Sequence, residues 1–160
     1  MAIKVGEKIP SMTLAYKGPD GIQEVTTDSI FKGKTVVLFS VPGAFTPTCS
    51  AKHLPGFVQN AGAIKAKGVD QIVCTSVNDP FVMDAWAKDQ KTGDAVFMLP
   101  DGSGNLAKAM GMEFDLTGRG LGVRGQRYAM VVKDGVVKSL HLEEPGKFEV
   151  SSAEHVMKDL

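Results

Sequence analysis

The sequence predicts an α/β fold in which helices flank a central mixed β-sheet, with a short β extension at the N-terminus. Apolar, β-branched runs typical of buried strands alternate with helical patterns along the 160 residues, which favours parallel strands in the middle of the sheet. Asp134-Gly135 separates two later strand-like runs and predicts a two-residue hairpin turn, which adds antiparallel strands. A helical pattern closes the chain and completes the layer of helices.

The expected strands follow one another in chain order. Thr35–Val41 is the clearest of them, because its apolar run is uninterrupted and indicates a buried strand. The first two strand-like pieces form the N-terminal extension and the remaining ones form the main sheet: Ser11–Tyr16, Ile22–Thr26, Thr35–Val41, Gln71–Val77, Ala95–Leu99, Tyr128–Lys133 and Val136–Leu142.

Four helical patterns lie between and after these strands. The first follows Cys49 and ends near Gly68, with Pro55 expected to kink it. The second begins at Asp79-Pro80, with proline in the first turn, and continues to about Gln90, and the third covers Asn105–Met110. The last begins at Ser151, which has capping-box spacing to Glu154, and is expected to continue to the end of the chain.

Length and composition restrict the class of protein. A chain of 160 residues predicts one domain, residues 1–160, with a core that needs no disulfide or metal. The charges of the 18 basic and 18 acidic side chains sum to zero. The sequence therefore has no excess of positive charge that would indicate nucleic acid or an anionic membrane as a partner. No apolar run is long enough for a membrane span, and the N-terminus lacks the features of a signal or transit peptide, so we expect a cytoplasmic protein.

Cysteine usage argues against a metal centre. The two cysteines are not part of a CxxC or Cys/His pattern, which makes a zinc site improbable. A reducing compartment would keep both as thiols. We expect no cofactor.

The segment Pro42–Ser50, PGAFTPTCS, is the most informative part of the sequence. It follows the strand Thr35–Val41 and precedes a helical pattern, so Cys49 is expected in the first turn of a helix at the carboxyl end of a strand. Unpaired backbone N–H groups and the positive end of the helix dipole stabilise a thiolate in that position. Although free cysteines are usually inert core residues, this proline- and glycine-rich turn indicates a reactive thiol.

The motif Pro42-x-x-x-Thr46-x-x-Cys49 resembles the PxxxTxxC signature of the peroxiredoxins. The residues of this segment resemble those of the type 5, or type II, subfamily in particular. The strings KHLPGF, VNDPFVMDAW, GLGVRGQRYAMVVKDGVVK and SAEHVMKDL look like that subfamily in the same order, so the resemblance covers essentially the full chain. It implies a thioredoxin-like fold and a thiol-dependent peroxidase that reduces hydrogen peroxide and organic hydroperoxides.

The resemblance implies roles for four residues. Cys49 would attack a peroxide oxygen as a thiolate and become a sulfenic acid. The Thr46 hydroxyl would contact both the sulfur and the peroxide, and Pro42, which has no N–H, would shield the sulfur from water. Arg127 would stabilise the thiolate and donate to the peroxide oxygens.

Sequence reasoning alone does not rank Arg127 above two neighbouring arginines. The resemblance selects Arg127, because it matches the arginine of an RYAMVV-like strand. Arg119 and Arg124 are then expected to be solvated loop charges or contacts that support a subunit interface.

His53 follows Cys49 by one helical turn and lies on the same face. A Cys49/His53 pair would also suit an acyl-transfer enzyme. We favour a supporting role for His53, because no orienting third residue or oxyanion signature accompanies the pair.

Cys74 lies in an apolar strand, where an inert buried thiol is the favoured interpretation. The resemblance leaves open whether it resolves the sulfenic acid, which would require disulfide geometry with Cys49. A one-cysteine cycle is preferred, with glutaredoxin and glutathione, or thioredoxin, as the external reductant.

The resemblance also implies a homodimer formed through loops that border the site. Phe45, Phe81, Trp86 and Leu121 are apolar residues near that site, and any that are exposed would suit an interface. A thioredoxin-like redox-sensing or binding module without sustained turnover is the alternative function.

Overall fold

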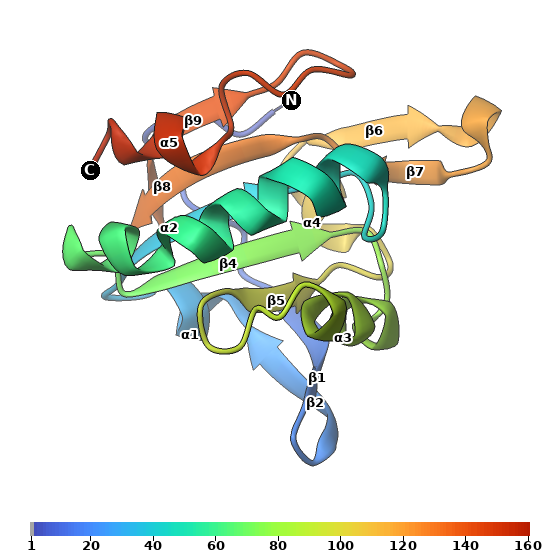
Figure 1. The fold of residues 1–160 in the computed structure, drawn as a ribbon, viewed down its shortest axis with the longest axis horizontal. Helices are drawn as coiled ribbons and strands as arrows, with labels where there is room; N and C mark the ends of the chain where they lie inside the picture. Colours follow the sequence, from blue (N-terminus) through green and yellow to red (C-terminus); the bar gives the residue numbers. More distant parts are fainter. Residues whose placement is uncertain (1) are drawn as a thin grey trace.

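The computed structural model describes residues 2–160 and contains a five-stranded mixed sheet with the order β5-β4-β3-β8-β9 (Figure 1). The strands are β3 (Thr35–Ser40), β4 (Gln71–Ser76), β5 (Phe97–Pro100), β8 (Tyr128–Lys133) and β9 (Val136–Leu142). β3 pairs in parallel with β4, which pairs in parallel with β5, whereas β8 is antiparallel to both β3 and β9. The predicted mixed sheet is confirmed.

The helices cover both faces of this sheet (Figure 1). On one face α2 (Leu54–Ala66) lies beside α5 (Ala153–Met157), and α3 (Pro80–Asp89) packs near the β5 edge. α1 (Thr27–Phe31) and α4 (Asn105–Ala109) belong to the other face. Each face has its own apolar cluster, and Cys49, Phe57 and Trp86 lie in the cluster on the α2 side.

The predicted N-terminal extension is an antiparallel hairpin of β1 (Thr13–Gly18) and β2 (Gly21–Thr26). The seven predicted strands all form, with ends within two residues of those expected. At the β8–β9 turn Asp134 and Gly135 both have positive φ, 49° and 78°, as a primed hairpin turn requires.

A second hairpin, β6 (Glu113–Leu116) and β7 (Gly122–Gly125), was not predicted, and neither was α1. Both β6 and β7 are short and partly exposed, so they lack the apolar pattern of a core strand. Their connection contains the 3₁₀ turn Thr117–Arg119. This hairpin projects from the side of the sheet at which β4 ends and α2 begins, and it therefore borders the site described below (Figure 1).

Two details of the helices differ from the prediction. The cap of α5 is Ser152, whose hydroxyl accepts from His155 N, rather than Ser151, and the helix ends at Met157 before the end of the chain. The expected kink near Pro55 takes the form of a π-helical turn, Cys49–His53, in which Leu54 N donates to Cys49 O. Pro55 has no N–H for an ordinary helical bond, and a π turn directly before it accommodates that loss.

Across residues 2–160, none of the helices has the length and apolar character needed to cross a membrane.

Candidate active site

Cys49 lies at the start of a helix that follows the carboxyl end of β3. The helix begins at Pro47, and Thr46 O accepts the first helical bond, from Ser50 N at 3.0 Å. Proline is favoured at the first helical position, because its missing N–H would have no partner there. Cys49 is therefore in the first turn, as predicted, where backbone N–H groups favour a nearby negative charge. Its side chain is fully buried.

Arg127 reaches Cys49 because of the register between β3 and β8. Ser40 pairs with Tyr128 at the end of the antiparallel ladder, so the residue before Tyr128 stands beside the segment that leaves β3. Arg127 Nη2 lies 3.0 Å from Cys49 Sγ and donates to it. A guanidinium in this position stabilises a thiolate through charge and a hydrogen bond.

His53 lies between Arg127 and the loop before α5. Its Nδ1 accepts from Arg127 Nη1 at 2.8 Å, and its Nε2 donates to Ser151 O at 2.8 Å. Burial, together with the Arg127 charge, lowers the pKa of His53 to about 3. The imidazole is thus neutral, and its lone pair is used by Arg127, so the ring is not available as a base for Cys49. This arrangement argues against the acyl-transfer alternative.

The depressed pKa of His53 predicts acid-sensitive stability. Its pKa falls from 6.5 to about 3 on folding, so the unfolded state binds the extra proton between these values. The free energy of unfolding should therefore be fully retained above pH 6.5 and fall as the pH drops below it, by about 1.4 kcal/mol per unit. Denaturant unfolding of wild type and His53→Gln at about pH 5 to 6.5 checks this, and an equally steep slope in the variant would contradict it.

The loop that carries Ser151 is held by one buried carboxylate. Glu143 Oε2 accepts from the backbone N–H groups of Glu149, Val150 and Ser151 at 2.8 Å each, and from Ser151 Oγ at 2.7 Å. Burial raises the pKa of Glu143, but these four hydrogen bonds outweigh it and leave the pKa below its usual value. Glu143 N also donates to Arg127 O at 3.0 Å. Glu143 thus fixes both Ser151 and the backbone of Arg127.

Thr46 and Pro42 belong to the loop between β3 and the helix. The Thr46 hydroxyl donates to Gly43 O at 2.6 Å, whereas the resemblance implied that it contacts the sulfur and the peroxide. Because a hydroxyl has one proton, this bond leaves its oxygen as an acceptor. Phe45, between these residues, has a φ of 63°, a conformation that is uncommon for an aromatic residue.

Arg124 is more than a solvated loop charge. It is half-buried, and its guanidinium donates to Leu121 O at 2.8 Å, Val77 O at 3.2 Å and Pro42 O at 3.5 Å. These carbonyls belong to three different loops around the site. A Cβ at Gly43 would lie 3.2 Å from Arg124 Nη1, so glycine there permits the close approach.

Cys74 lies inside the sheet, in β4, with Phe39 of β3 and Met98 of β5 as its neighbours in register. It is fully buried in the same apolar cluster as Cys49. Burial, and to a lesser extent the Cys49 charge, raise the pKa of the Cys74 thiol, with partial opposition from Arg127. The thiol is therefore protonated and unreactive in this state.

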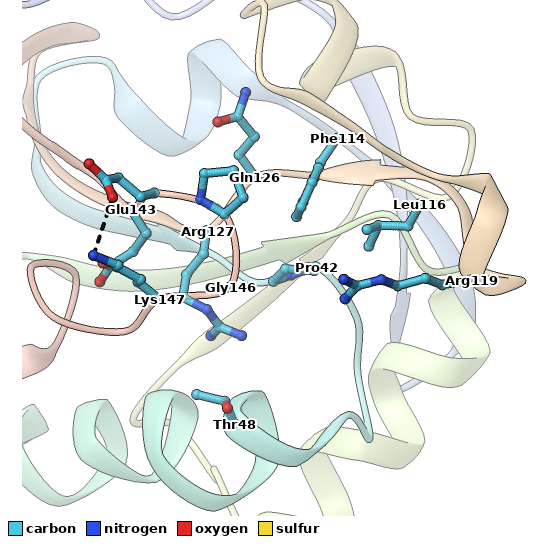
Figure 2. Close-up of a pocket in the computed structure, with 12 residues that line it drawn as sticks. Pro42, Thr48, Phe114, Leu116, Arg119, Gln126, Arg127, Glu143, Gly146 and Lys147 are labelled. Atoms are coloured by element: carbon cyan, nitrogen blue, oxygen red, sulfur yellow. Dashed lines mark ion pairs between the residues drawn. The ribbon is translucent and has the colours of Figure 1, made fainter.

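A cavity of about 310 Å³ lies next to Cys49, and its lining includes Pro42, Thr48 and Arg127. Figure 2 shows the Arg127 guanidinium directed toward Thr48, with Pro42 and Arg119 on the β6–β7 side and Glu143 and Lys147 opposite. The cavity gives a small molecule access to the immediate neighbours of the sulfur.

The structure brings Cys49, Arg127 and His53 into one neighbourhood, whereas sequence reasoning found no signal for Glu143 or Ser151. Another unpredicted contact is the indole of Trp86, whose Nε1 donates to Ser50 Oγ at 3.0 Å. Trp86 is the only tryptophan of the sequence. Trp86 therefore provides a fluorescent reporter that contacts Ser50, the residue next to Cys49.

Comparisons with known proteins show which family the chain resembles. Residues 4–157 match the Redoxin family model. The chain is 52% identical over 163 residues to "Peroxiredoxin-2E, chloroplastic" of Arabidopsis thaliana, covering 99% of this chain and 70% of that protein. It is 47% identical over 159 residues to "Peroxiredoxin-2C" of Oryza sativa subsp. japonica, covering 99% of this chain and 98% of that protein.

Among solved structures, a reduced Prx3 of Vibrio vulnificus in complex with hydrogen peroxide is 47% identical. The two superpose with a TM-score of 0.94 over 98% of each chain. The thioredoxin-like fold that the sequence predicts is confirmed by this similarity.

Proposed function

Because the chain belongs to the peroxiredoxin family and is a thiol-dependent peroxidase, we propose that Cys49 is the thiol that the peroxide oxidises. The observation that carries this assignment is the 3.0 Å contact between Arg127 Nη2 and Cys49 Sγ. Cys49 is the only one of the two cysteines that stands at the start of a helix with a cation beside it. Similarity to a relative solved with bound hydrogen peroxide supports the same substrate here.

The reaction is a displacement at oxygen. The Cys49 thiolate attacks one oxygen of ROOH, an S–O bond forms, and the O–O bond breaks. Sulfur loses two electrons and becomes a sulfenic acid, while RO⁻ leaves and takes up a proton to give water or an alcohol. Negative charge moves from sulfur to the leaving oxygen during this step.

Arg127 is suited to follow that movement of charge, because its Nη2 already lies at the sulfur. As the O–O bond lengthens, the same guanidinium donates to the developing oxyanion. The free acceptor of the Thr46 hydroxyl, whose proton is given to Gly43 O, receives the peroxide O–H and orients the molecule. Pro42 offers no N–H that would compete for the sulfur.

His53 acts through Arg127 and is a positioning residue. Its neutral ring, held between Arg127 Nη1 and Ser151 O, prevents the guanidinium from turning away from the sulfur. Phe39, Phe57 and Phe148 surround the ring at centroid distances of 4.9, 5.6 and 4.9 Å. This packing keeps the imidazole neutral and fixed.

Regeneration requires an external thiol. We assign the role of resolving thiol to a reductant and not to Cys74, because Cys74 is a buried, protonated thiol between two strands. A thiol R′SH attacks the sulfenic acid and releases water, and a second R′SH releases R′SSR′ and restores Cys49. Glutathione with glutaredoxin, or thioredoxin, supplies this chemistry.

Intact mass spectrometry tests this cycle. After one equivalent of hydrogen peroxide and then one equivalent of glutathione, wild type and Cys74→Ala should both carry one glutathione, on Cys49. With excess glutathione and glutaredoxin, both should sustain turnover. A sulfenic-acid trap added before glutathione should label Cys49. An internal disulfide in wild type, seen as the loss of two hydrogens, or loss of turnover in a folded Cys74→Ala protein, would contradict a one-cysteine cycle.

We further assign a homodimer interface to the loops beside the site. Phe45, Phe81 and Leu121 are 53%, 61% and 36% exposed, and exposed aromatic residues are enriched at interfaces. Trp86, in contrast, is fully buried and belongs to the core. A monomeric mass by sedimentation would contradict this interface.

The proposed compartment is the cytosol, where two buried free thiols persist. The alternative location is another reducing compartment, because one relative is named as chloroplastic.

A further inference from the structure

The cavity beside Cys49 has two unlike sides. On one side Glu143 is occupied by backbone donors and Glu144 pairs with Lys147 at 3.3 Å, so these charges are already compensated. The other side is formed by Phe114, Leu116 and Arg119 of the β6–β7 hairpin. Figure 2 shows the Arg119 guanidinium pointing into the cavity toward Pro42.

Arg119 is a cation without a counterion in the part of the chain that the structure describes. It is absent from the ion pairs formed among residues 2–160. Arg127, the other arginine of the cavity, is engaged by Cys49 and His53. Arg119 is therefore the cavity's available partner for an anion, and its planar fork suits a carboxylate.

The apolar side chains next to Arg119 exclude a simple polar anion as the best occupant. Phe114 and Leu116 line the cavity beside Arg119, and Pro42 lies between Arg119 and Arg127 (Figure 2). The volume of about 310 Å³ admits a ligand considerably larger than hydrogen peroxide. A ligand that satisfies both features has an apolar carbon skeleton with a carboxylate at one end.

We propose that this cavity selects organic hydroperoxides that carry a carboxylate, with Arg119 binding the carboxylate and the apolar side chains contacting the carbon skeleton. The proposal rests on the peroxidase function assigned to Cys49. The –OOH group then lies at the Arg127 side, where the thiolate displaces the alkoxide and the product is a hydroxy acid. Arg119 does not touch the reacting atoms and determines specificity only.

Peroxidase assays with a hydroperoxy derivative of octanoic acid and its methyl ester test the proposal, because the ester keeps the carbon skeleton but carries no charge and is larger by one methyl group. Wild type should reduce the acid with a kcat/KM roughly fivefold higher than the ester, as for one exposed ion pair, and high salt should reduce this ratio. Arg119→Gln should bring the ratio close to one, and Arg119→Lys should restore part of it. Lys108→Gln, which removes an exposed charge outside the cavity, should keep the wild-type ratio.

Octanoate itself gives a second readout. It should inhibit reduction of hydrogen peroxide competitively in wild type and much less in Arg119→Gln. If wild type reduces hydrogen peroxide but treats acid and ester alike, the assignment of Arg119 is overturned and the peroxidase function stands. If wild type fails to reduce hydrogen peroxide with any thiol, the proposed function itself fails.

Discussion

Replacing Cys49 with serine is expected to lower peroxide reduction to the uncatalysed rate. A serine hydroxyl in this position is protonated at neutral pH and is a far weaker nucleophile toward the O–O bond than a thiolate. The Arg127 guanidinium, 3.0 Å from the sulfur, favours an anion that a neutral hydroxyl does not provide. Steady-state consumption of hydrogen peroxide with glutathione and glutaredoxin measures this loss.

The matched control is Cys74→Ala, which removes the other thiol of the same apolar cluster. It should retain turnover, with a modest loss of stability from the small cavity that it creates. Persistence of full activity in Cys49→Ser, with the peroxide consumed at another residue, would reject the assignment of Cys49.

The second large effect is expected at Arg127. Arg127→Gln removes both the charge beside the sulfur and the donor for the leaving oxygen, and it leaves His53 Nδ1 without its partner. Loss of one preorganised donor at a developing oxyanion typically costs 10²- to 10³-fold in rate, and we expect about this loss in kcat/KM for hydrogen peroxide. The kcat/KM of Arg127→Lys should lie between those of wild type and Arg127→Gln. An ammonium keeps the charge but does not bond Cys49 and His53 at the same time, as the guanidinium fork does.

Lys108→Gln again provides a control that removes one positive charge away from the site. It should have wild-type kinetics, whereas a comparable loss in this variant would mean that overall charge, and not the position of Arg127, governs the rate. Circular dichroism of each variant separates a kinetic effect from unfolding.

The sequence predicted the main sheet well, because its strands are buried and have a strong apolar signal. Tyr128–Lys133 and Val136–Leu142 agree residue for residue with β8 and β9, since the Asp134-Gly135 turn fixes both their ends. The β6–β7 hairpin was missed, because its strands have only four residues each and are partly exposed. Its stability depends on tertiary contacts, which local patterns do not report.

The residues of the site also fall into those that the sequence reveals and those that it does not. A motif of nearby residues revealed Cys49 and Thr46, and the resemblance selected Arg127, but only the β3–β8 register explains why Arg127 meets the sulfur. Glu143 and Ser151 were missed, because a carboxylate that bonds backbone N–H groups six to eight residues away leaves no periodic pattern. Arg124 was expected to be a solvated loop charge or an interface contact. Its bonds within the chain were missed, because the carbonyls that accept them come from three separate loops.

The most direct test of the account is the rate of Cys49 oxidation in a single turnover, followed by stopped-flow fluorescence of Trp86, whose indole bonds Ser50 Oγ. The same proteins are also alkylated with iodoacetamide, which reacts with a thiolate but needs no donor at a leaving oxyanion. If Arg127 stabilises both the thiolate and the leaving oxygen, Arg127→Gln should lose much more rate toward hydrogen peroxide than toward iodoacetamide. Equal losses toward both reagents, or an unchanged rate toward hydrogen peroxide, would contradict the role given to Arg127.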